Sequence, residues 1–306
     1  MFKKKPINIV FWLILENHGH SVTFFSYLCK EQSKKIMKSK KILFVNQEII
    51  PYVADSELSR IGRNLPQSIL EKGYEIRTFM PKWGNINERR GQLHEVIRLS
   101  RMMIIFDETD HPLIIKVASI PSTRIQVYFI DNDDYFTKRL MANDENGEEY
   151  EDNGERSIFF ARGVLETIKK LHWTPDIIHC QGWIGNIIPY YVKTAYKDEP
   201  SFANAKIVTS LFGNGLKKDI EPTFRQCLDF KEASSDVLDN YNKKFDFTEF
   251  EKFAIDYSDG VVEAGPGVNP ELVEYAKGKG IQFLSQAGET ELNTDAYDSF
   301  YDSILE

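Results

Sequence analysis

Apolar positions change their spacing from one segment of the chain to the next. Residues 42–46 (ILFVN) form a short β-branched and apolar run, typical of a strand that is covered on both faces. Residues 61–72 follow with apolar side chains at a helical spacing, and Gly73 provides a stop. A second strand at 74–80 (YEIRTFM) is ended by Pro81. This order of strand, loop, helix and strand predicts the start of a parallel, right-handed, doubly wound sheet.

Three strand-like runs in the middle of the chain are joined by short polar connections. The runs cover residues 96–101, 113–120 and 125–130, with polar connectors at 107–112 and 121–123. A parallel return between two strands needs about a dozen residues, and these connectors are shorter. The three runs therefore predict antiparallel strands inserted in the sheet.

The second half of the chain returns to an alternation of helix and strand. In chain order, the pattern predicts helices at 153–171, 187–195 and 245–257 and strands at 176–180, 207–211 and 259–263, the last being the final strand. An acidic amphipathic stretch at 288–306 predicts the final helix. The expected fold class is therefore α/β, with a Rossmann-like, doubly wound, mostly parallel sheet that contains inserted antiparallel strands.

The first residues pair a basic cluster with a short apolar run, MFKKKPINIVFWLIL, which is the outline of a secretory signal. The run stops at Glu16 without a small-residue cleavage site, and it is shorter than the roughly 20 residues that span a bilayer. Met37 offers a second start, from which lysines lead directly into the first strand. We therefore favour residues 1–36 as an extension outside the fold over an export or membrane signal. The folded domain is expected at 37–306, and the start of translation, at Met1 or Met37, stays open.

Charge and cysteine content exclude several functional classes. The 306 residues include 46 acidic and 38 basic side chains, and the net charge of -8 gives no basis for binding nucleic acid or an acidic membrane. Cys29, Cys180 and Cys227 are odd in number and lack C-x-x-C spacing, which predicts reduced thiols in a cytoplasmic protein. The chain has no P-loop motif, no G-x-G-x-x-G after the first strand and no metal-ligand spacing of its six histidines. We therefore expect no metal and no cofactor.

Four segments carry specific motifs, in the order 48–58 (EIIPYVADSEL), 124–136 (RIQVYFIDNDDYF), 152–166 (DNGERSIFFARGVLE) and 175–183 (PDIIHCQGW). The first is similar to the E-x-x-P-x-x-K-x-G-G-L loop of the glycogen/starch synthases, glycosyltransferase family 5. The others resemble that family's V-Y-F-I-D-N, D-N-x-E-R and P-D-x-x-H-x-H-D-W segments, and the resemblance extends over about 38–265. It implies the N-terminal starch-synthase domain of a two-domain GT-B glycosyltransferase that acts in glycogen biosynthesis.

The departures from the family pattern fall on positions that, by resemblance, contact the nucleotide sugar. Ala54 replaces the loop lysine, whereas Ser56 and Glu57 replace the two glycines. A lysine neutralises diphosphate charge and glycines let backbone N–H groups approach it, but a carboxylate at Glu57 repels it. Gln181 stands in place of the family's second histidine, and Gly182 replaces the aspartate after it.

The resemblance places candidate substrate-binding residues at six positions, namely Tyr52, Ser56, Glu57, His179, Gln181 and Trp183. Two of them have a simpler structural interpretation. His179 lies in a predicted strand, where a neutral, buried histidine with a local partner is favoured over an acid or base. Trp183 is favoured as packing between sheet and helix over a surface that stacks on a sugar. No catalytic residue is assigned.

A second domain of the family is expected to be missing. By resemblance, that domain binds the donor and supplies an Arg/Lys clamp, which stabilises the charge developing on the diphosphate. The stretch 288–306 resembles the final helix of the first domain and leaves no room for a second domain of roughly 150 residues. Lys217 and Lys218 are the nearest basic pair beside glycines, and a solvated loop is the favoured interpretation.

Three functional hypotheses follow. In the first, the protein transfers glucose from ADP-glucose, its donor substrate, to an α-1,4-glucan acceptor, with the donor-binding domain supplied by a separate chain or by self-assembly. In the second, it is a non-catalytic glucan-binding or regulatory subunit that keeps the acceptor half of the fold. In the third, the scaffold holds another small-molecule site, because fold does not fix function. The changes at 54–57 and Gln181 favour the second mechanism, whereas the resemblance favours the first, so activity of the chain alone stays open.

Overall fold

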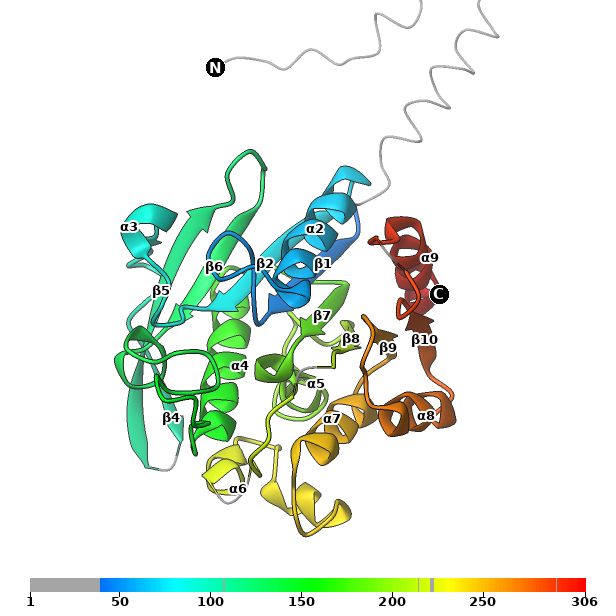
Figure 1. Cartoon of the computed structure of the whole chain (residues 1–306). Helices are drawn as coiled ribbons and strands as arrows, with labels where there is room; N and C mark the ends of the chain where they lie inside the picture. Colours follow the sequence, from blue (N-terminus) through cyan, green and yellow to red (C-terminus); the bar gives the residue numbers. More distant parts are fainter. Residues whose placement is uncertain (1–38, 107, 214, 221–222, 290) are drawn as a thin grey trace, which may run out of the picture. The chain divides into compact units, whose positions relative to one another are not determined.

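The computed structural model describes residues 39–106, 108–213, 215–220, 223–289 and 291–306 (Figure 1). The expected extension at 1–36 lies outside the described residues. The strands are β1 (Lys41–Asn46), β2 (Glu75–Pro81), β3 (His94–Glu95), β4 (Met102–Phe106), β5 (Thr109–Ser119), β6 (Gln126–Asp131), β7 (Ile177–Gln181), β8 (Lys206–Leu211), β9 (Gly260–Glu263) and β10 (Gln282–Ser285). The α-helices are α2 (Glu57–Glu71), α3 (Glu88–Gly91), α4 (Asn153–Lys170), α5 (Ile188–Lys193), α6 (Thr223–Leu228), α7 (Phe247–Asp256), α8 (Pro270–Gly278) and α9 (Thr294–Leu305).

The strands form one mostly parallel sheet with antiparallel strands at one edge. The order is β10-β9-β8-β7-β1-β2-β6-β5-β3, and β4 pairs with β5. Every neighbouring pair from β10 to β6 is parallel, whereas β5 runs antiparallel to β6, β3 and β4. The predicted α/β, doubly wound sheet with inserted antiparallel strands is therefore confirmed.

β1 lies in the middle of the sheet, and its side chains alternate between two hydrophobic cores. Leu43 and Val45 pack in the core that contains residues of α4, whereas Ile42 and Phe44 pack in the core that contains residues of α2 and α9. All four side chains are completely buried. Because helices cover both faces, the four central positions of this strand are apolar and no polar alternation is seen there.

The predicted strand at 96–101 is wrong, because these residues form a turn between β3 and β4. Leu99 is buried, but Ile97 is 59% exposed, so the apolar run does not face a core along its whole length. The backbone N–H groups of Leu99 and Ser100 both donate to the Val96 carbonyl, which closes the turn. Arg101 then adopts a left-handed conformation (φ 64°), which ends any extended run.

The predicted strand at 259–263 is confirmed as β9, but it is not the final strand, because α8 and β10 follow it. β10 pairs in parallel with β9 and extends the sheet by one strand. The final helix begins at Thr294 instead of 288, since the Asn293 side chain accepts a hydrogen bond from the Ala296 N–H and caps it. None of the helices in the described part of the chain has the length and apolar character that a membrane crossing requires.

Candidate functional site

The topology of the sheet marks one position as a candidate ligand site. β1 is followed along the chain by β2 on one side, whereas β7, on its other side, is followed by β8. Ligands of open parallel sheets bind at the carboxyl ends of the strands where the chain order reverses in this way. We call this region the strand-end site and define it as the ends of β1 and β7 (Asn46 and Gln181), loop 47–56 and the first turn of α2.

Loop 47–56 is fixed to the end of β7 by Gln47. The Gln47 N–H donates to the Gln181 carbonyl (2.9 Å), and its side-chain Oε1 accepts from the Trp183 N–H (3.1 Å). Gly182 lies between them at φ 90°, and a Cβ there would approach Gln47 Oε1 to 2.6 Å. The aspartate that the resemblance expects at this position is therefore excluded by close packing as well as by backbone conformation.

Trp183 is part of the core beneath this loop. Its side chain is buried, and its ring lies 6.3 Å from that of Trp83, whose indole N–H donates to the Gln47 carbonyl (2.8 Å). This placement favours the structural interpretation of Trp183. The sugar-stacking role of Trp183 stays a prediction, and it would require the buried indole to become exposed to a ligand.

The first turn of α2 is surrounded by the protein's own carboxylates. Ser56 and Ser59 cap each other across the helix start, with the Ser56 Oγ accepting from the Ser59 N–H at 3.0 Å. The Ser56 hydroxyl in turn donates to Glu48 Oε2 (2.6 Å). Asp55 and Glu57 flank this cap and are exposed. A helix N-terminus attracts anions, but here three carboxylates occupy its surroundings, so a diphosphate is repelled.

Glu57 also reaches across the sheet end. A Cβ built on Gly265, which follows β9, would lie 2.3 Å from Glu57 Oε1. The carboxylate therefore lies directly against the backbone after β9, and a larger residue at position 265 would make the Glu57 side chain turn away. Glu57 thus brings the start of α2 next to the end of β9.

Two fully buried amides end the neighbouring strands β1 and β7. Asn46 and Gln181 are register partners, so their side chains lie on the same face of the sheet. Both are completely buried, and neither amide has a hydrogen-bond partner among the described residues. Buried polar groups without partners are costly, at about 1–3 kcal/mol each, and they concentrate at functional sites. Because the Gln181 side chain is completely buried, it could contact a substrate only if the residues packed over it moved. Its role as a substrate contact stays a prediction.

His179 is a buried histidine with both ring nitrogens paired. Its Nδ1 lies 2.7 Å from the Tyr301 hydroxyl of α9, and its Nε2 lies 2.7 Å from the Ser210 hydroxyl of β8. Burial lowers the pKa of the imidazole to about 3, so the ring is neutral at physiological pH. The geometry therefore favours the structural role over acid–base chemistry.

The buried His179 predicts a pH dependence of stability. The unfolded chain takes up this proton near pH 6.5, whereas the folded pKa is about 3, so stability is lost as the pH falls between these values. The expected slope is up to about 1.4 kcal/mol per pH unit. Urea unfolding of the wild type and His179→Gln between pH 7 and pH 4 measures it. The difference in unfolding free energy between the two proteins should shrink on acidification, and a constant difference would contradict the assignment.

Tyr52 lies in the core instead of on the surface of the strand-end site. Its ring meets Phe129 edge-on, with centroids 4.9 Å apart, and it is 8% exposed. Burial raises the pKa of its hydroxyl to about 12, and this hydroxyl has no hydrogen-bond partner among the described residues. Of the six predicted positions, Ser56 and Glu57 are therefore the two that meet at an accessible part of the strand-end site.

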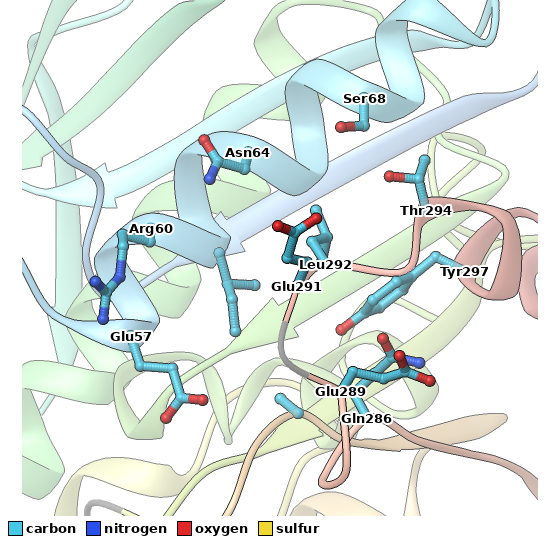
Figure 2. Close-up of a pocket in the computed structure, with 12 residues that line it drawn as sticks. Glu57, Arg60, Asn64, Ser68, Gln286, Glu289, Glu291, Leu292, Thr294 and Tyr297 are labelled. Atoms are coloured by element: carbon cyan, nitrogen blue, oxygen red, sulfur yellow. The ribbon is translucent and has the colours of Figure 1, made fainter.

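A pocket of about 630 Å³ runs along α2, and we call it the α2–α9 pocket (Figure 2). It is lined by Glu57, Arg60, Ile61, Asn64, Ser68, Ala264, Gln286, Glu289, Glu291, Leu292, Thr294 and Tyr297. No pattern in the sequence predicts this pocket, because its walls come from two segments, 57–68 and 264–297, that lie far apart along the chain. The acidic character of the chain after 288 is its one visible signal. Among the described residues, no group of acidic, histidine or cysteine side chains is placed to bind a metal ion.

Comparisons with known proteins agree in pointing to one family. The family model described as the starch synthase catalytic domain matches residues 41–286. A glycogen synthase of Chlorobium luteolum is 39% identical over 186 residues, covering 60% of this chain and 38% of that protein. A glycogen synthase of Chlorobaculum parvum is 34% identical over 230 residues, covering 75% of this chain and 46% of that protein. The chain thus spans less than half the length of these relatives.

One solved structure has the same fold. The catalytic domain of starch synthase IV from Arabidopsis thaliana, bound to ADP and acarbose, is similar with a TM-score of 0.58 at 16% sequence identity. The similarity covers 85% of this chain and 53% of that one. At this identity the likeness concerns the fold.

Proposed function

The chain belongs to the family of starch synthase catalytic domains, and we propose that it acts in α-1,4-glucan synthesis as the half of a glucosyltransferase that holds the acceptor chain. The match over residues 41–286 carries this proposal. The donor substrate is ADP-glucose and the acceptor is the non-reducing end of an α-glucan. In this transfer the bond between glucose C1 and the diphosphate oxygen breaks and ADP leaves. A bond between C1 and an acceptor hydroxyl oxygen forms, and the proton of that hydroxyl is released, so that the products are the extended glucan, ADP and a proton.

The charges at the strand-end site limit what the described domain does in this reaction. The leaving ADP develops negative charge, and cationic or N–H groups aimed at it usually make the largest catalytic contribution. Here Glu48, Asp55 and Glu57 surround the start of α2, and Arg60 is paired with Asp55 at 3.5 Å. We therefore propose that the groups that bind the diphosphate come from outside the described residues or from a partner chain.

A second candidate function is a glucan-binding or regulatory subunit without transfer activity. The acidic first turn of α2 favours it, since this turn opposes donor binding. Both candidate functions require the chain to bind an α-glucan, but only the first includes transfer of glucose from ADP-glucose.

One experiment with two readouts separates these candidates. The purified chain is incubated with glycogen and labelled ADP-glucose, and the glycogen is then sedimented. Both candidates predict that protein pellets with glycogen. Incorporation of label by the chain alone supports the first and excludes the second, whereas binding without incorporation supports the second or a missing partner. Adding a separate chain that carries a donor-binding domain then decides, because incorporation in the mixture supports the first candidate.

A further inference from the structure

Two buried oxygen atoms in the α2–α9 pocket lack a hydrogen-bond partner among the described residues. Tyr297 is completely buried and Gln286 is 6% exposed, and both side chains line the pocket. The Tyr297 hydroxyl and the Gln286 Oε1 have no hydrogen-bond partner among the described residues. Figure 2 shows the Tyr297 hydroxyl directed from α9 toward the space near Gln286 and Glu289. The Gln286 oxygen only accepts hydrogen bonds and the tyrosine hydroxyl can accept one, so a ligand that donates hydrogen bonds fits both atoms.

The charged groups around these two atoms are acidic. Glu289 and Glu291 are exposed at the pocket, and Glu57 closes the end near the start of α2. Arg60 is the lining cation, but its guanidinium pairs with Asp55 at 3.5 Å and lies at the same end as Glu57 in Figure 2. The lining thus carries a formal charge of -2, from three carboxylates and one guanidinium. Phosphates and other anions are disfavoured here.

We propose that the α2–α9 pocket binds a small organic polycation, a ligand with two or more ammonium groups on a flexible aliphatic chain. An ammonium group has three hydrogen-bond donors and no acceptor, which matches carboxylate, amide and hydroxyl oxygens. The acidic groups of the described residues do not converge on one point as metal ligands do, so an extended cation fits them better than a single ion. Ile61, Ala264 and Leu292 give the aliphatic parts of the ligand an apolar contact.

This pocket adjoins the strand-end site through Glu57, but part of its wall lies outside the family match. The family match ends at residue 286, whereas Glu289, Glu291 and Tyr297 come from the segment after it. One wall of the pocket is therefore built by residues that the family model does not include. Binding there goes beyond the proposed function in glucan synthesis, and it occupies a groove of α2, the helix whose first turn belongs to the strand-end site.

Calorimetric titration of the full chain with spermidine at pH 7 and low salt tests this proposal. We expect one saturable site per chain. The double variant Glu289→Gln/Glu291→Gln should bind at least about tenfold more weakly, since each charged hydrogen bond contributes strongly. Tyr297→Phe removes an acceptor without changing charge and should weaken binding about fivefold. Because the Tyr297 hydroxyl has no described partner, this variant should fold as well as the wild type, which thermal unfolding verifies.

A matched control separates the pocket from the general acidity of the chain. Glu145→Gln/Glu232→Gln removes two exposed carboxylates outside the pocket and should leave spermidine binding unchanged. An equal loss of affinity in this control, or the absence of saturable binding in the wild type, overturns the proposal. Saturable binding of maltotriose or ADP that disappears in Glu289→Gln/Glu291→Gln also overturns it, since the pocket would then take a sugar or an anion.

Discussion

Replacing Arg156 by alanine is expected to lower the free energy of unfolding by about 3–5 kcal/mol, because four hydrogen bonds of a fully buried cation are lost. The guanidinium donates to the carbonyls of Tyr135 (3.0 Å), Leu140 (2.7 Å) and Met141 (2.5 Å) and to Asn153 Oδ1 (2.8 Å). Without Arg156, these acceptors remain buried next to a cavity. The D-N-x-E-R motif therefore has a structural role, which is to hold the segment between β6 and α4 in place.

Urea unfolding at pH 7 measures this loss, and two further variants define its cause. Burial lowers the pKa of the Arg156 guanidinium to about 9, so the group is still protonated at pH 7. Arg156→Lys keeps the charge but loses the planar arrangement of donors, and it should be intermediate in stability. Arg98→Ala removes an exposed arginine and should change stability by less than about 0.5 kcal/mol. A loss below about 1 kcal/mol in Arg156→Ala would contradict this role.

Restoring the family's loop is expected to strengthen ADP binding at least about tenfold. The triple variant Ala54→Lys/Ser56→Gly/Glu57→Gly replaces one carboxylate and adds one cation, a change of +2 beside the start of α2. A tenfold effect corresponds to about 1.4 kcal/mol, well below the roughly 4 kcal/mol of one close charge pair near a protein surface. Glycine at the N-cap reduces helix stability by only a few tenths of a kcal/mol, so folding should survive the change.

Calorimetric titration with ADP measures this effect, with Glu145→Lys as the matched control. That variant changes the net charge by the same +2, but in an exposed loop outside the α2 region. If the control gains as much affinity as the triple variant, the gain comes from overall charge. An unchanged affinity in the triple variant would show that the carboxylates at the α2 start do not limit donor binding.

The parallel part of the sheet could be predicted from the sequence because burial on both faces leaves a simple pattern. β1 contains four consecutive apolar residues and every residue of β7 is buried, and helices with a clear spacing separate these strands from the next ones along the chain. The turn at 96–101 has a similar apolar content, but it takes its structure from local hydrogen bonds and the left-handed Arg101. Composition alone does not distinguish these two situations.

The sequence alone indicates where charged side chains of the candidate site stand, but it does not indicate which of the site's side chains are buried by tertiary packing. The effect of Glu57 follows from a carboxylate at a helix start, a position that the motif fixes. The burial of Gln181 and Tyr52 depends on contacts between distant segments, such as Gln47 against the end of β7 and Phe129 against Tyr52, which no local pattern encodes. The α2–α9 pocket forms because α9 packs in the same hydrophobic core as α2, on one face of the sheet. This is a contact between segments that are distant in the sequence.

Sedimentation of the wild-type chain with glycogen tests the central claim, acceptor binding in glucan synthesis, most directly. The chain should move from the supernatant to the glycogen pellet, and soluble maltooligosaccharides should release it by competition. An unrelated acidic protein of similar charge serves as the control and should stay in the supernatant. A chain that remains in the supernatant at every glycogen concentration would contradict the account.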